Sequence, residues 1–69
     1  MTLIQAQEKY IAQVNACVRP RDRRNRVRRS ANRKLHDYCL SIGMTDFTLI
    51  NHVKRDAWDM AELERNSDD

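Results

Sequence analysis

Apolar residues recur at helical spacing in three stretches of the chain. In the first stretch they lie three, four or seven positions apart, a spacing that places them on one face of a helix. Thr2 followed by Gln5 fits a capping box, in which each side chain satisfies an unpaired backbone donor at the helix start. Pro20 ends the stretch, because the residue before a proline avoids the helical region. The pattern predicts a first helix over about 3–18, with these residues on its apolar face: Leu3, Ile4, Tyr10, Ile11, Val14, Cys17 and Val18.

Two further amphipathic stretches flank the single glycine of the chain. The first predicts a helix over about 21–42, followed by Gly43 in the left-handed conformation that often terminates helices. The second predicts a helix over about 46–65 with Thr45 as its N-cap, and we expect 66–69 to fray. The inner positions are Val27, Ala31, Leu35, Tyr38, Cys39 and Ile42 in one helix and Phe47, Ile50, Val53, Ala57, Met60 and Ala61 in the other.

These elements predict an all-α fold, with 1–69 forming a single small three-helix domain. The short link between the second and third helices permits an antiparallel hairpin. In that hairpin Leu35 faces Val53 and Ala31 faces Ala57.

The small size of the chain favours a partner subunit. A chain of 69 residues buries only roughly 60% of its unfolded surface, so its own core is small. We therefore expect a homodimer. The candidate dimer or partner patch consists of Tyr10, Ile11 and Trp58.

Charge is distributed unevenly behind a net value of +3. The Arg-rich segment 19–34 has nine basic residues and one acidic residue, whereas 35–69 has three basic and eight acidic residues. Arginine presents a planar fork of donors that suits phosphate, so a dense arginine segment indicates nucleic acid as the first partner to consider. We expect a small regulator that binds nucleic acid through an arginine-rich helix in transcriptional control, with DNA favoured over RNA. The candidate contacts are Arg19, Arg21, Arg23, Arg26, Arg29, Arg33 and Lys34.

A second interpretation assigns the arginines to the protein itself. Acidic residues near the end of the third helix, Asp59, Glu62 and Glu64, oppose its dipole, and facing arginines would explain them. The alternative function is therefore a small helical inhibitor or adaptor that binds another protein. Its arginines would meet an acidic partner surface or form internal salt bridges.

The turn at Gly43 also admits a helix-turn-helix motif. Asn51, Lys54 and Arg55 would then be available as base or partner contacts, and an asparagine amide suits adenine. However, His52 stands where that motif expects an aliphatic residue, and a plain hairpin is the alternative.

Other classes of function find little support in the sequence. No nucleophile–base pair or glycine-rich phosphate loop is present, so we expect neither an enzyme, a small-molecule substrate nor a cofactor. The spacing C-x18-H-x2-C-x12-H matches no compact zinc pattern, so we expect no metal. The chain also has no apolar run long enough for a membrane span and no secretion signal, so we expect a cytoplasmic protein with reduced cysteines.

Overall fold

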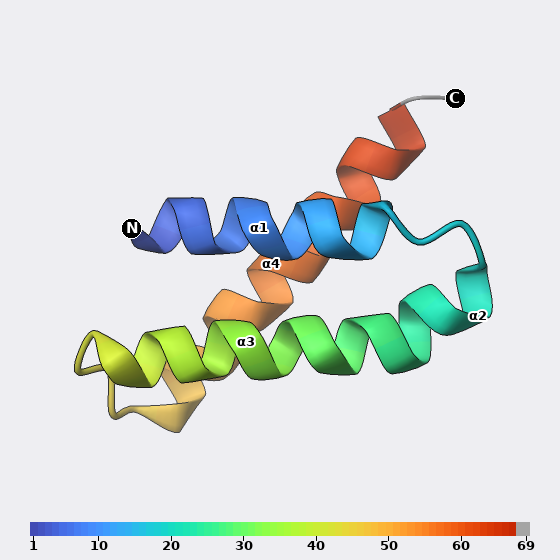
Figure 1. Cartoon of the computed structure of the whole chain (residues 1–69). Helices are drawn as coiled ribbons and strands as arrows, with labels where there is room; N and C mark the ends of the chain where they lie inside the picture. The colour runs from blue at the N-terminus through green and yellow to red at the C-terminus, as the bar shows by residue number, and fades with distance from the viewer. Residues whose placement is uncertain (68–69) are drawn as a thin grey trace.

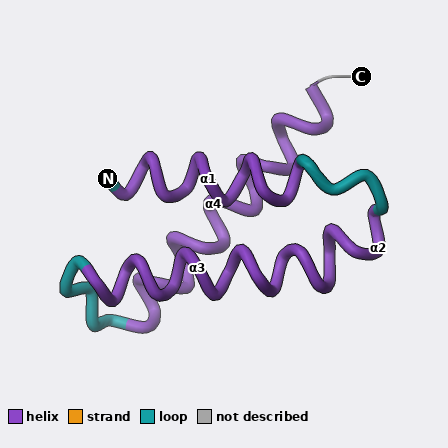
Figure 2. The backbone as a smooth tube through the Cα atoms, in the orientation of Figure 1, coloured by secondary structure: helices purple, strands orange, loops and turns teal. Residues whose placement is uncertain are grey.

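The computed structural model describes residues 1–67, and every regular element in this part of the chain is helical, with three long helices. Figure 1 and Figure 2 show the chain as helices joined by short loops. No helix in this part of the chain is long and apolar enough to span a membrane.

Helix α1 spans Leu3–Asn15 and begins at the predicted capping box. The Gln5 backbone N–H donates to Thr2 Oγ1 over 3.2 Å, and the Thr2 backbone N–H donates to Gln5 Oε1 over 2.9 Å. The helix ends earlier than the predicted residue 18, and Val18 is 87% exposed. Arg19 has an extended backbone before Pro20, as expected of a residue that precedes proline.

The second predicted helix is one rod made of three segments. It consists of α2 (Pro20–Asp22), the π-helical turn η1 (Arg23–Val27) and α3 (Arg28–Ser41). A π turn accommodates one extra residue, so the residues before it shift in phase relative to α3. Arg23 lies eight positions before Ala31 in the chain, but because the π turn absorbs one residue, the helix rotates between them as it would over seven residues. Residues seven positions apart lie on the same face of an α-helix, so Arg23 and Ala31 share a face.

The turn after α3 satisfies the backbone groups that the helix end leaves free. Gly43 has φ +87°, as predicted, and its N–H bonds to Leu40 O while the Met44 N–H bonds to Cys39 O. These are the two hydrogen bonds of a Schellman motif.

Helix α4 spans Phe47–Ser67, and its N-cap corrects the prediction of Thr45. Asp46 Oδ1 accepts from the Thr48 N–H over 2.9 Å and from the Leu49 N–H over 3.4 Å, so Asp46 takes the capping role. The helix also continues through two of the four residues expected to fray, and 68–69 lie outside the described residues.

The antiparallel hairpin predicted for the second and third helices is not confirmed. Figure 1 and Figure 2 show α1 and α3 running side by side in opposite directions, with α4 crossing both obliquely. Helix α4 packs more extensively on α1 than on α3. Nine of the ten core residues were predicted as apolar positions, and only Ala6 was not: Ala6, Tyr10, Val14, Ala31, Leu35, Cys39, Ile50, Val53, Ala57 and Ala61. Four other predicted positions are wrong, because Ile4, Ile42, Phe47 and Met60 are exposed.

Candidate nucleic-acid interface

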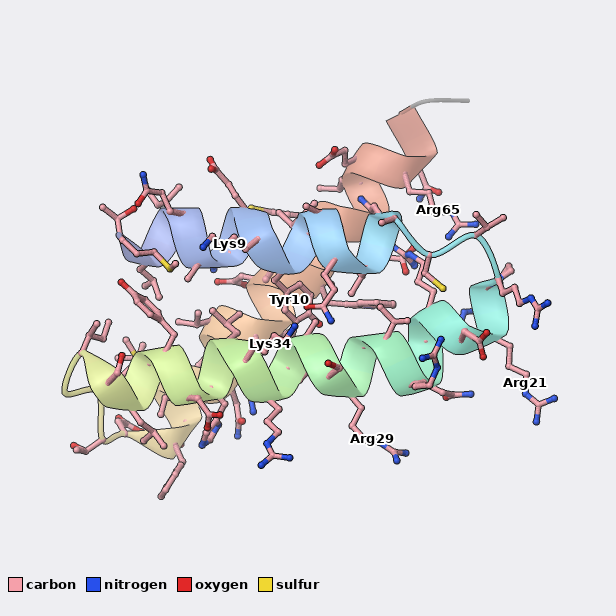
Figure 3. All side chains as sticks on the ribbon, in the orientation of Figure 1. Lys9, Tyr10, Arg21, Arg29, Lys34 and Arg65 are labelled. Atoms are coloured by element: carbon pink, nitrogen blue, oxygen red, sulfur yellow. The ribbon has the colours of Figure 1, made fainter. Side chains whose placement is uncertain are left out.

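Three predicted arginines share the outer surface of the rod formed by η1 and α3. Arg26, Arg29 and Arg33 are exposed and line one shallow hollow together with Asn25 and Ser30. Within residues 1–67, no carboxylate forms an ion pair with any of these three guanidinium groups. Figure 3 shows Arg29 projecting away from the packed helices. We call Arg26, Arg29 and Arg33 the arginine face.

Three other predicted contacts lie outside the arginine face. Arg19 and Arg21 are exposed beside the turn that leads into α3, and Figure 3 shows Arg21 pointing outward. Lys34 is exposed and lines a separate, mainly apolar cleft between α1 and α3, with Lys9 on the opposite helix.

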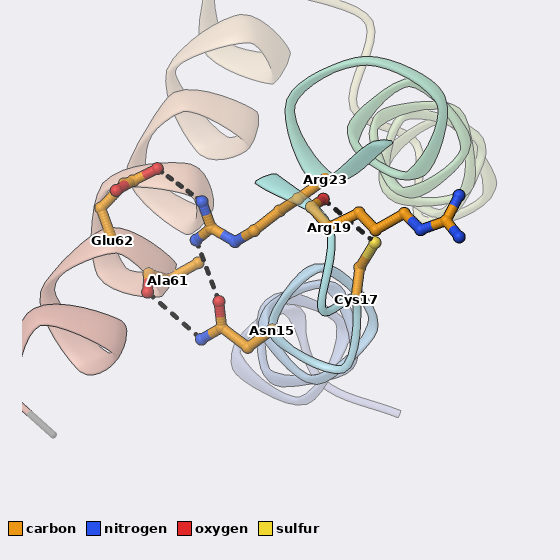
Figure 4. Close-up of polar contacts among 6 residues, drawn as sticks. All are labelled: Asn15, Cys17, Arg19, Arg23, Ala61 and Glu62. Atoms are coloured by element: carbon orange, nitrogen blue, oxygen red, sulfur yellow. Dashed lines mark hydrogen bonds and ion pairs between the residues drawn. The ribbon is translucent and has the colours of Figure 1, made fainter. Parts of the chain in front are cut away.

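Arg23 is the exception among the predicted contacts, because its side chain is only 3% exposed. Its guanidinium donates to Glu62 Oε1 over 2.7 Å and to Asn15 Oδ1 over 2.9 Å. Figure 4 shows Arg23 reaching toward these two partners while Arg19 points the other way. The phase shift of the π turn explains why Arg23 faces inward. We therefore remove Arg23 from the predicted surface and assign it a structural role.

A second basic surface lies between α3 and α4. It is a hollow of about 550 Å³ that combines three cationic side chains, two amides, an indole and one carboxylate. The structure thus brings the predicted base or partner contacts together with Trp58 from the predicted patch. Arg28 and Asn32 were not among the predicted site residues, although the expected pairing of Ala31 with Ala57 places their helix against 54–59. We call this surface the basic hollow: Arg28, Asn32, Asn51, Lys54, Arg55, Trp58 and Asp59.

Neighbouring side chains hold several groups of the basic hollow in place. The Arg28 Cζ lies 4.1 Å from the centroid of the Trp58 ring, within the range of a cation–π contact. The Arg23 Cζ lies 4.6 Å from the same ring, so the indole contacts two guanidinium groups. Lys54 Nζ lies 3.3 Å from His36 Nδ1.

Tyr10 orients the amide of Asn32. Burial raises the pKa of Tyr10, against the opposing effect of the Arg28 charge. The hydroxyl therefore keeps its proton and donates to Asn32 Oδ1 over 2.8 Å. Because the amide oxygen is engaged, the Asn32 amino group is the part of this side chain left to donate to a ligand.

The predicted dimer or partner patch is not a single surface. Tyr10 is 2% exposed and belongs to the core, which corrects its assignment to a surface patch. Ile11 and Trp58 are partly buried and pack against the core.

Two cysteines and two histidines are the residues that the sequence offers as candidate zinc ligands. Cys17 and Cys39 are free thiols, and Cys39 is buried. His36 stacks on Phe47 with 6.0 Å between ring centroids. Among the described residues, no group of three or more His, Cys, Asp or Glu side chains is arranged to hold a metal ion.

Comparison with protein-family models, with curated proteins and with solved structures gives no match.

Proposed function

We propose that the protein binds nucleic acid through the arginine face, and that it acts in transcriptional control with DNA as its first partner. The observation that supports this proposal is the set of three exposed guanidinium groups without a carboxylate partner among residues 1–67. Arg26 and Arg33 lie seven positions apart, over which a helix rises roughly 10 Å, a length comparable to the span of a few phosphates along one strand.

The arrangement leaves positive charge available to a polyanion. Arg19 and Arg21 extend the basic surface beyond the arginine face. Each engaged phosphate of a duplex contributes about −0.9 to the slope of log affinity against log salt. Three engaged phosphates would therefore give a slope of about −2.7, and six would give a slope near −5.

Single-charge variants test this proposal most cleanly. Binding of mixed-sequence duplex DNA and of structured RNA is measured at several salt concentrations for the wild type, Arg29→Ala and Lys9→Ala. Lys9 is the matched control, because it is exposed and basic but lies on α1, away from the arginine face.

We expect Arg29→Ala to make the slope of log affinity against log salt less negative by about 0.9. Lys9→Ala should leave this slope unchanged. The melting temperature of both variants should match that of the wild type. The assignment of the arginine face would be refuted if the wild type did not bind, or if both variants lost the same amount of affinity.

A second candidate function is supported by apolar side chains that remain exposed. Ile4 is 67% exposed near the start of α1, and Met60 and Leu63 are 40% and 69% exposed on the second half of α4. These side chains favour contact with another protein, either as an adaptor or inhibitor or in the expected homodimer. Sedimentation of the wild type and of Leu63→Ser tests this candidate, because the substitution should weaken a self-association that buries Leu63.

A further inference from the structure

We infer that the basic hollow receives one unpaired nucleotide of the bound nucleic acid, an inference that rests on the proposed nucleic-acid binding. The arginine face lies on a single helix, and such a surface follows a phosphate backbone. The basic hollow is an open depression of about 550 Å³ between α3 and α4, and its lining adds an indole and a carboxylate to amides and cations. This mixed lining can contact a nucleobase as well as a phosphate, so it favours an inserted nucleotide over the backbone of a continuous strand.

The excess of positive charge in the basic hollow favours an anionic ligand. Arg28, Lys54 and Arg55 face a single carboxylate, Asp59. The contacts of Arg28 with Trp58 and of Lys54 with His36 position two of these cations before a ligand arrives. Preorganised donors of this kind lose little side-chain freedom on binding. We assign the phosphate of the inserted nucleotide to Lys54 and Arg55.

The remaining groups of the hollow suit a nucleobase. The Asp59 carboxylate accepts hydrogen bonds and repels a phosphate, so it favours a ligand that also presents N–H donors. Asn32 offers its amino group to a base acceptor, since Tyr10 engages its oxygen. Arg28 lies over Trp58. Unpaired bases stack on the planar faces of arginine guanidinium groups.

These features together specify an unpaired base that has two adjacent N–H donors. In a duplex the donors are engaged in pairing and the ring faces are covered by neighbouring bases, so a paired base does not fit the hollow. Among the four common bases, guanine presents a ring N–H next to an exocyclic amino group, a pair that matches the two oxygens of Asp59. The inferred ligand is an unpaired guanine nucleotide.

Oligonucleotides that differ by one unpaired guanine test the inference. Affinity is measured at one salt concentration for a fully paired hairpin and for the same hairpin with a single bulged guanine. We expect the wild type to bind the bulged hairpin about tenfold more tightly, in line with the contribution of one stacked base. Arg55→Gln, an exposed substitution, should remove this preference while Lys9→Gln keeps it.

A base analogue tests the role of Asp59. Inosine lacks the exocyclic amino group of guanine, so the wild type should prefer a bulged guanine to a bulged inosine, and Asp59→Asn should lose that preference. Trp58 is the only tryptophan and lines the hollow, so its fluorescence reports occupancy directly. Titration with guanosine monophosphate should change this signal, whereas inorganic phosphate at the same concentration should not.

The outcomes separate this inference from the proposed function. Equal affinity of the wild type for paired and bulged hairpins, with Arg29→Ala still weakening both, overturns the inference and leaves the arginine face intact. Loss of binding to both hairpins in the wild type refutes the proposed function itself. A Trp58 response to inorganic phosphate equal to that for the nucleotide identifies a simple anion site and also overturns the inference.

Discussion

The Arg23 guanidinium and the Glu62 carboxylate form an ion pair of 2.7 Å that joins the π turn to the second half of α4. Arg23 also donates to Asn15 Oδ1, and the Asn15 amide in turn donates to Ala61 O over 3.2 Å. One buried side chain therefore connects the end of α1, the π turn and α4. This connection depends on all three elements, so it forms only in the assembled fold.

The two partners of this ion pair are not equivalent, and we predict unequal effects of removing them. Arg23 is 3% exposed, whereas the side chain of Glu62 is 38% exposed. Glu62→Ala leaves a buried charge without its partner and should destabilise the fold by about 2–3 kcal/mol. Arg23→Met fills the same space without a charge and should cost less, because Glu62 can be solvated. Urea denaturation measures the free energy of unfolding of the two variants. An equal decrease in both would show that burial of the Arg23 charge is not the dominant effect.

Stability should fall at acid pH because of the same pair. The hydrogen bond from Arg23 lowers the pKa of Glu62 below its ordinary value. The pair therefore stabilises the fold fully above the unfolded-state pKa of about 4.3, and this contribution is lost as the pH falls through the lower folded-state pKa. Melting temperatures at pH 7 and pH 3 should show a smaller difference in Glu62→Gln than in the wild type. An unchanged difference would contradict the assignment.

The N-cap of α4 makes a prediction that separates two adjacent residues. Asp46 accepts hydrogen bonds from two backbone donors of the first turn, so Asp46→Ala should cost about 1 kcal/mol in the free energy of unfolding. Thr45→Ala is the matched control and should have little effect, since the cap lies one residue later than the sequence suggested. A larger loss in Thr45→Ala than in Asp46→Ala would restore the sequence-based assignment.

The two thiols should react at different rates with a thiol reagent. Cys39 is fully buried, and burial raises the pKa of its thiol, so little reactive thiolate forms. Cys17 is only partly buried. We expect one fast-reacting thiol in the native protein and two after denaturation. The fast phase should disappear in Cys17→Ser, and its persistence there would show that Cys39 is accessible.

Local sequence determined the elements of this protein. Thr2 with Gln5 defined the start of α1, Gly43 defined the end of α3, and the 3.6-residue period identified most core positions. These features depend on residues a few positions apart, so they can be derived without knowing how the helices pack.

Only the tertiary structure decided how the helices meet. Helix α4 crosses α1 and α3 obliquely and packs more extensively on α1 than on α3, which the apolar pattern along the chain did not indicate. The π turn shifted the helical phase, so that Arg23 faces Glu62 in the interior instead of solvent. A crossing angle and an inserted turn are set by contacts between residues far apart in the chain, and a regular period counted along the sequence does not contain that information.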